Sequence, residues 1–360
     1  MSELEPSGGG SSTSFEPQER TGKPVSFYLA IFLGLLLLVS GGLNLLLLVV
    51  SVFGSATAGL AGIADDSSAL YDVVAVGGDP EADQRVLRIH VEGAIAEASS
   101  PLLGAEGGTI SQVERALKLA KRDDDIRGVL LDINSPGGGV TDSDRIWMLL
   151  RDFREETDKP ILALFGDTAA SGGYYIAAAA DRILARPTTI TGSIGVILSN
   201  LNFAEAAREF GIRQEVVVSD RTPYKDIMSP FRPMTDEERA ILKSIVDEMY
   251  DRFVDVVDRG RPKLSRDEVV ALADGRIYSA RQAAENGLVD GIATREEALA
   301  QLAEMCGAES VRLVEQRRRP TFADLLFQSR AEPPSLDAGL AQLLGRSTGP
   351  RLLYWWSGGR

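Results

Sequence analysis

The feature that most restricts how this chain can fold is a long apolar stretch without charge. Residues 24–64 contain no Asp, Glu, Lys or Arg, and residues 27–53 are dominated by Leu, Val, Ile and Phe. About 20 apolar residues are enough for a helix to cross a bilayer. We therefore expect a single transmembrane anchor helix over residues 26–54.

The charges beside this stretch predict the orientation of the helix. Arg20 and Lys23 precede it, whereas Asp65 and Asp66 follow it. Because positive residues stay on the cytoplasmic side, we expect a single-pass protein of the inner or plasma membrane, with a cytoplasmic N-terminus and the remainder outside. The alternative is a signal peptide cleaved near Ala58, but the apolar run is long and begins late for that.

Composition divides the rest of the chain into four segments. Residues 1–25 are polar and rich in Gly, Ser and Glu, which predicts a disordered cytoplasmic tail. Residues 55–83 are rich in Gly, Ala and Asp and are interpreted as a linker. Residues 84–305 form the folded domain, and residues 306–360, rich in Arg, Pro and Gly, are interpreted as a poorly packed C-terminal extension.

Alternating strand and helix patterns predict an α/β fold for the domain, with a largely parallel sheet covered by helices. Strands are predicted over residues 86–91, 126–133, 160–165, 182–185, 194–198 and 214–218. Helices are predicted over residues 110–121, 140–153, 172–180 and 203–210. Further helices are expected to begin at Thr235, Ser265 and Thr294, because each is followed three residues later by Glu, as in a capping box.

Composition also excludes several functions. The net charge is -14 and the isoelectric point is near 4.7, which disfavours nucleic-acid binding. The single cysteine, Cys306, allows no intramolecular disulfide and is expected to be an inert core residue. The single histidine, His90, excludes a multi-histidine metal site and is expected to be structural within its strand. The sequence predicts no metal and no cofactor.

Two glycine-rich turns contain candidate catalytic residues. Asn134-Ser-Pro-Gly-Gly-Gly139 follows a predicted buried strand, and such glycines let backbone N–H groups converge on a phosphate or an oxyanion. Thr168-Ala-Ala-Ser-Gly-Gly173 positions Ser171 at a helix start, where the following N–H can face an oxyanion. On these residues alone, a tight strand–helix turn and an ordinary N-cap serine remain the alternatives.

A serine nucleophile needs a base. If His90 is structural, a lysine is the remaining candidate, provided that desolvation lowers its pKa from about 10.4. Lys225 differs from the other lysines because it lies in a semi-apolar loop, after Pro223-Tyr224 and before Asp226. The alternative, a solvated loop lysine, stays open on this residue alone.

Several of these motifs, taken together, resemble one known family. They are residues 134–139 (NSPGGG), 168–175 (TAASGGYY), 191–195 (TGSIG) and 224–230 (YKDIMSP). Their order and spacing resemble the bacterial signal peptide peptidase A family of the Clp protease/crotonase superfamily, over about residues 84–305 plus the anchor helix. The resemblance implies a Clp protease/crotonase-like fold with repeated β-β-α units. The spacing of Ser171 and Lys225 fits the half-length, single-domain form.

The resemblance implies a role for each candidate. Ser171 matches the nucleophile and Lys225 the general base. Ser193 matches a hydroxyl that orients the lysine, and the N–H groups of Gly138 and Gly172 match the oxyanion hole. We therefore expect a serine peptidase with a Ser/Lys dyad that degrades cleaved signal peptides and similar small apolar peptides at the membrane.

The resemblance also implies ring or dome homo-oligomers in which adjacent protomers share active sites. Two other functions remain as alternatives: a crotonase-type acyl-CoA enzyme, and a non-catalytic membrane scaffold of the same fold. The apolar residues 352–356 (LLYWW) are compatible with binding in a peptide groove.

Overall fold

The structure, a computed structural model, describes residues 25–61, 71–97, 108–319 and 352–355. The chain divides into two units, Met1–Ala69 and Leu70–Arg360. Nearly all of the predicted disordered tail lies outside the described residues.

The first unit contains one long helix, α1 (Val25–Ala61). Its segment Phe27–Leu45 has a mean hydropathy of 2.0 and is long and apolar enough to cross a membrane. The predicted apolar helix is therefore confirmed. The helix continues seven residues past the predicted end at residue 54, into the stretch interpreted as a linker.

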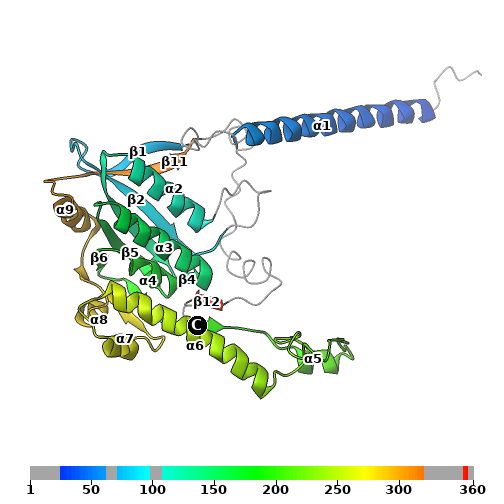
Figure 1. Cartoon of the computed structure of the whole chain (residues 1–360). Coiled ribbons are helices and arrows are strands. Elements are labelled where there is room, and N and C mark those ends of the chain that lie inside the picture. Colours follow the sequence, from blue (N-terminus) through cyan, green and yellow to red (C-terminus); the bar gives the residue numbers. More distant parts are fainter. Residues whose placement is uncertain (1–24, 62–70, 98–107, 320–351, 356–360) are drawn as a thin grey trace, which may run out of the picture. The chain divides into compact units, whose positions relative to one another are not determined.

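The second unit is built on a nine-stranded sheet with the central order β1-β11-β2-β3-β5-β6-β10 (Figure 1). The parallel strands are β2 (Arg85–Glu92), β3 (Ile126–Ser135), β5 (Ile161–Ala170), β6 (Arg182–Ala185), β10 (Gly291–Ile292) and β11 (Arg312–Arg318). The antiparallel strand β1 (Tyr71–Gly78) forms one edge. Two short strands, β7 (Ile190–Gly192) and β9 (Ile277–Ser279), extend the sheet beside β5. The predicted α/β fold with a largely parallel sheet is confirmed.

Two strands of this sheet lie outside the predicted domain boundaries. β1 falls within the predicted linker over residues 55–83, and β11 falls within the predicted extension over residues 306–360. Both corrections have one cause. These strands pair with each other, and β11 also pairs with β2, so each depends on a partner far away in sequence.

Alternating residues of the central strands divide the core between the two faces of the sheet. One face packs against helices α2 (Thr109–Arg122), α3 (Val140–Glu156), α4 (Gly172–Ala177) and α6 (Asp236–Gly260). The other face packs against α9 (Arg295–Met305). Leu87 and Leu131 contribute to the first core, whereas Val86 and Leu130 contribute to the second, as the two-residue period of a strand requires.

The predicted capping boxes at Thr235, Ser265 and Thr294 are present, at the starts of α6, α7 (Arg266–Leu272) and α9. A fourth box at Ser279, closed by Gln282, begins α8 (Ala280–Glu285) and was not predicted. Cys306 follows α9 and is half-buried, so it lies at the edge of the core. Burial raises the pKa of its thiol to about 11, as expected for an inert cysteine.

A separate three-stranded sheet has the order β4-β12-β8, formed by β4 (Gly137–Gly139), β12 (Leu352–Trp355) and β8 (Ile197–Leu198). The strand predicted over residues 194–198 is therefore much shorter. The strand predicted over residues 214–218 is wrong: this stretch is exposed and irregular, because it has no pairing partner among the described residues.

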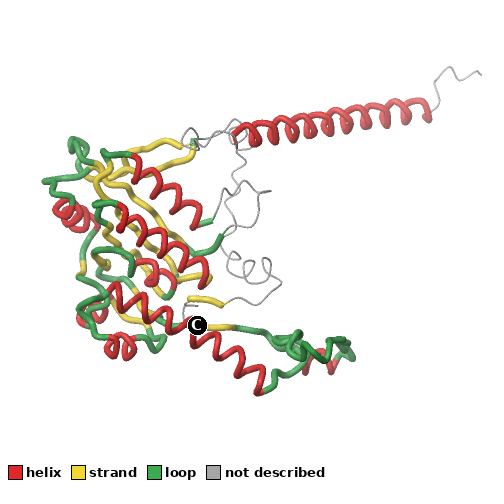
Figure 2. The backbone as a smooth tube through the Cα atoms, viewed as in Figure 1, coloured by secondary structure: helices red, strands yellow, loops and turns green. Residues whose placement is uncertain are grey.

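Residues 197–245 carry many exposed apolar side chains, and we call them the apolar arm. The arm includes α5 (Ala204–Glu209), which lies away from the sheet together with the start of α6 (Figures 1 and 2). Its exposed apolar residues are Ile197, Leu201, Phe203, Phe210, Ile212, Val216, Val217, Val218, Tyr224, Phe231, Ile241 and Ile245. A surface of this kind is typical of a protein–protein contact.

Candidate active site

Ser171 lies in the sharp turn between β5 and α4. Its backbone has φ 52° and ψ −116°, a conformation that residues with a Cβ rarely adopt. The side chain is 1% exposed, and its Oγ has no hydrogen-bond partner among the described residues. Ser171 does hold the N-cap position of α4, but its side chain makes no capping hydrogen bond. The ordinary N-cap interpretation is therefore wrong.

Two backbone hydrogen bonds fix this turn and bring Ser193 near it. The Ser171 N–H donates to the Gly192 carbonyl at 2.7 Å, at the point where β5 pairs with β7. The next residue, Ser193, also has a positive φ of 50°, and its N–H donates to the Arg276 carbonyl at 2.7 Å. The motifs around Ser171 and Ser193 therefore lie side by side, although a helix and a strand separate them in sequence.

The glycine turn after β3 contacts the turn after β5. A Cβ on Gly172 would lie 3.0 Å from the Gly138 nitrogen and 2.5 Å from the Ser143 Oγ. Ile95 accepts from the Gly139 N–H at 3.0 Å and donates to the Gly137 carbonyl at 2.9 Å. Because neighbouring residues of a strand point their polar groups to opposite sides, the Gly138 N–H faces away from Ile95.

Ser143 was missed by the sequence reasoning. It is fully buried in the first turn of α3, and its Oγ has no hydrogen-bond partner among the described residues. Its proximity to Gly172 adds a second unpaired hydroxyl beside the Ser171 turn. The only sequence signal for it was its place in the helix that follows the glycine turn.

A first prediction concerns Gly138. A Cβ at this position would lie 2.0 Å from the Ile95 carbonyl oxygen, so Gly138→Ala must displace the turn. If the Gly138 N–H stabilises an oxyanion, we expect kcat to fall by about 10²–10³-fold. Steady-state kinetics on the full chain measure this, and Gly77→Ala in β1, where the nearest atom to a Cβ would lie 3.8 Å away, is the control. Unchanged kcat in Gly138→Ala would contradict the assignment.

Lys225 is not brought to Ser171 within one chain. It is exposed, in the apolar arm between α5 and α6. No hydrogen bond or ion pair joins it to Ser171 or Ser193 in the part of the chain that the structure describes. The structure thus brings together four of the predicted site residues, which are Ser171, Ser193, Gly138 and Gly172. The fifth, Lys225, remains apart from them.

A part-buried ion-pair cluster holds the loop that follows Lys225. Arg232 donates to both carboxylate oxygens of Asp226, at 2.8 and 3.0 Å, and to Glu238 at 2.8 Å. Hydrogen bonds from Arg232 hold the pKa of Asp226 and of Glu238 below their usual values. This stabilisation is therefore present above the ordinary pKa values of the carboxyl groups and is lost as the pH falls through the lowered ones.

Most other described lysines have structural partners. Lys118, Lys121 and Lys243 form ion pairs with nearby carboxylates, and Lys159 donates to two backbone carbonyls. Lys225 differs from these lysines because its ammonium group has no hydrogen-bond or ion-pair partner among the described residues. It therefore remains a candidate base.

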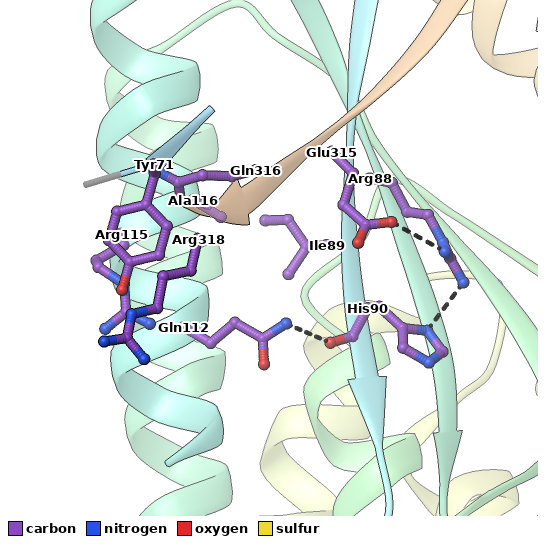
Figure 3. A pocket seen from close by; sticks show the side chains of 10 residues that line it. All are labelled: Tyr71, Arg88, Ile89, His90, Gln112, Arg115, Ala116, Glu315, Gln316 and Arg318. Carbon is purple, nitrogen blue, oxygen red and sulfur yellow. Dashed lines mark hydrogen bonds and ion pairs between the residues drawn. The ribbon is translucent and has the colours of Figure 1, made fainter. Parts of the chain in front are cut away.

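His90 is structural, as predicted. Its Nδ1 lies 3.1 Å from an Arg88 nitrogen, and its Nε2 lies 2.9 Å from a Glu92 oxygen. His90 is among the residues that line a cavity of about 290 Å³ beside α2, β2 and the β1–β11 edge, and Figure 3 shows its ring directed toward Arg88. No contact joins His90 to Ser171 among the described residues, which excludes a Ser-His pair within the chain.

A groove of about 750 Å³ adjoins β8. Its lining is partly apolar and comes mostly from the apolar arm, with Ile197, Leu198, Met228 and Met234 among the lining residues, together with Val246, which directly follows the arm in α6. β8 belongs to the same small sheet as β4, the strand that contains Gly138, with β12 between them.

Comparison with known proteins agrees with this site. Residues 154–309 match the model of peptidase family S49. The putative signal peptide peptidase SppA of Enterococcus faecium is 36% identical over 286 residues, which are 77% of this chain and 82% of the relative. Protease 4 of Haemophilus influenzae is 34% identical over 60% of this chain and 34% of its own length. The chloroplastic serine protease SPPA of Arabidopsis thaliana is 29% identical over 72% of this chain and 39% of its own length.

Each of these relatives is named as a protease or a peptidase, and the stretch that matches the family model includes Ser171, Ser193 and Lys225. The strained serine turn beside the glycine turn after β3 is the part of the fold that such chemistry needs. The chain belongs to peptidase family S49, the SppA family, and is a serine peptidase with an apolar N-terminal helix that fits a membrane anchor.

Proposed function

We propose that this protein is a membrane-anchored serine endopeptidase that uses Ser171 and Lys225 as a catalytic dyad. The observation that carries the proposal is the Ser171 hydroxyl, which is buried and has no hydrogen-bond partner in the described part of the chain, at a strained turn next to Gly138 and Gly172. An unpaired buried hydroxyl is costly. A nucleophile that receives its base from elsewhere explains why this one is retained.

The proposed reaction has two steps. A neutral Lys225 amine takes the proton of Ser171, whose Oγ attacks the peptide carbonyl, and the N–H groups of Gly138 and Gly172 stabilise the oxyanion. The lysine then gives the proton to the leaving amine, which leaves an acyl group on Ser171. A water activated by the same lysine hydrolyses this ester, and the Ser193 hydroxyl orients the amine throughout.

We propose that Lys225 reaches Ser171 of an adjacent copy of the chain, in a ring or dome. Two observations support a homo-oligomer. Lys225 is exposed and apart from the Ser171 turn of its own chain, and the arm that contains it exposes a series of apolar side chains. Docking the arm on a neighbour would bury these side chains and desolvate the lysine, which favours its neutral form.

The proposed substrates are peptides with small or apolar side chains, such as the signal peptide remnants released in a membrane. The partly apolar groove beside β8 supports this choice. The anchor helix, with its N-terminus in the cytoplasm and the peptidase domain outside, would hold the site close to such peptides.

A fluorophosphonate probe tests the proposal, because it reacts with an activated serine. In the full chain purified in detergent, we expect labelling of Ser171 and cleavage of an apolar fluorogenic peptide. Ser171→Ala should lose both, whereas Ser111→Ala, a serine in α2, should keep both. Absence of labelling in an assembled oligomer would instead favour a non-catalytic scaffold.

A further inference from the structure

The residue that follows the proposed base is an acid. Asp226 comes directly after Lys225, and Lys225 must be neutral to take a proton from Ser171. A carboxylate within about 4–6 Å of an amine favours the charged form of that amine. An Asp226 side chain turned toward Lys225 would therefore hold the lysine in the form that cannot act as a base.

The Asp226 carboxylate is bound by Arg232 instead. The Arg232 Nε donates to one carboxylate oxygen at 2.8 Å, and the Nη2 donates to the other at 3.0 Å. The same Nη2 lies 3.3 Å from the backbone carbonyl oxygen of Asp226 and also donates to it. Two donors that bind both oxygens in this way orient a carboxylate more firmly than one donor does. In the part of the chain that the structure describes, the ion pair of Asp226 is with Arg232 and not with Lys225.

Further donors of Arg232 attach the lysine loop to the start of α6. They bond to the Glu238 carboxylate, one of them at 2.8 Å. Glu238 is 3% exposed and also accepts the Thr235 N–H at 2.9 Å, in the capping box of α6. A buried carboxylate that loses its charged partner is costly. The Glu238 side chain therefore holds the Arg232 guanidinium in the position from which it binds Asp226.

The other charged groups around Lys225 come from the same stretch, which lies between α5 and the first turn of α6 (Figure 1). They are Arg213, Glu215, Asp220, Arg221, Asp226, Arg232, Asp236, Glu237 and Glu238. Among the described residues, the ion pairs within this set are those of Arg232 with Asp226 and Glu238. The acid adjacent to the lysine in sequence is thus one of the two that Arg232 binds.

We propose that Arg232 is a positioning residue for the peptidase reaction, which withdraws the Asp226 carboxylate from Lys225 and so keeps the lysine amine available as a base. This rests on the proposed function, in which Lys225 accepts the proton of Ser171. Arg232 acts through Asp226. The alternative is that the cluster only stiffens the arm. Loss of stiffness would lower activity at every pH, whereas a freed carboxylate lowers it only where it keeps the lysine charged.

Arg232→Met tests this, because methionine leaves Asp226 free to pair with Lys225. The base must be neutral, so kcat/KM rises with pH as the base loses its proton. A freed carboxylate favours the charged amine, and we expect this acidic limb of the profile to move up by about one pH unit. On the limb, kcat/KM then falls about tenfold, and at pH values above the limb the loss disappears.

Two further variants separate the charge of Asp226 from the stiffness of the loop. Adding Asp226→Asn to Arg232→Met removes the freed carboxylate, and we expect the limb to return to its original pH. Glu238→Gln breaks the other half of the cluster but keeps an acceptor for the capping box, so its limb should stay in place. If the cluster only stiffened the arm, the double variant would be the most impaired of the three.

The profiles are measured on the full chain in detergent with an apolar fluorogenic peptide, and Lys225→Ala is measured beside them. Circular dichroism and native mass verify folding and assembly. If Arg232→Met does not fold, Arg232→Gln, whose amide can still donate to Glu238, replaces it with the same expected shift.

An unmoved limb in the Arg232 variant, or a moved limb that Asp226→Asn does not return, would overturn the proposal. If Lys225→Ala were inactive in the same experiment, the dyad would stand without this role of Arg232. Full activity in Lys225→Ala would refute the dyad itself and the role of Arg232 with it.

Discussion

Replacing Ser171 with glycine should abolish peptide hydrolysis and at the same time stabilise the fold. The activity is lost with the nucleophile, by a factor on the order of 10⁴–10⁶ in kcat. The stability rises because Ser171 has φ 52°, where a side chain is strained by about 1–3 kcal/mol and glycine is not. After the larger chain entropy of unfolded glycine is subtracted, a net gain of about 1 kcal/mol remains.

Ser171→Ala is the matched control for this prediction. It also lacks the hydroxyl, so it should be equally inactive, but it keeps the Cβ and therefore the strain. Urea unfolding of the folded domain measures the difference in stability, and fluorogenic peptide cleavage measures the activity. If the glycine variant were no more stable than the alanine variant, the turn would not be strained. If either variant cleaved peptide at the original rate, Ser171 would not be the nucleophile.

The Ser171 turn also shows how far a sequence predicts such a site. The pattern of a strand followed by Ser-Gly-Gly and a helix predicted where the serine lies, and the resemblance to a peptidase family predicted its role. The same pattern fits an N-cap serine, and only the backbone conformation and the unpaired Oγ distinguish the two. Hydrogen bonding to Gly192 sets that conformation, and this pairing depends on β7, which was not predicted.

Strands with local signals were predictable, and strands that depend on distant partners were not. β2, β3 and β6 carry buried apolar runs, and the structure has them close to the predicted bounds. β1 and β12 pair with strands that are far away in sequence. Their own residues therefore led to the prediction of a linker for β1 and of a poorly packed extension for β12. Residues 214–218 alternate like a strand but pair with nothing in the described part of the chain.

The membership in a serine peptidase family also decides between the functions left open by the sequence. An acyl-CoA enzyme would use the same glycine amides, but the family matched over residues 154–309 is one of peptidases. A scaffold without activity would have no reason to keep a strained and unpaired Ser171.

Mixing two inactive variants should restore activity if Lys225 acts on the serine of a neighbouring chain. Lys225→Ala alone should lower kcat by about 10²–10⁴-fold, the usual contribution of a general base. Ser171→Ala alone should be inactive. In a mixed ring, a site formed by the Ser171 of one variant and the Lys225 of the other is complete. Random assembly of equal amounts makes about one site in four complete.

The mixture must be co-assembled, for example by co-expression, and its activity compared with that of each variant and of the unsubstituted chain. Lys263→Ala is the matched control, because Lys263 lies in a polar connection between α6 and α7, outside the arm. It should be active on its own. If the mixture were as inactive as its parts while the oligomer formed normally, each site would have to draw both residues from one chain. The arm would then have to fold back onto Ser171, and its exposed apolar residues would need another partner.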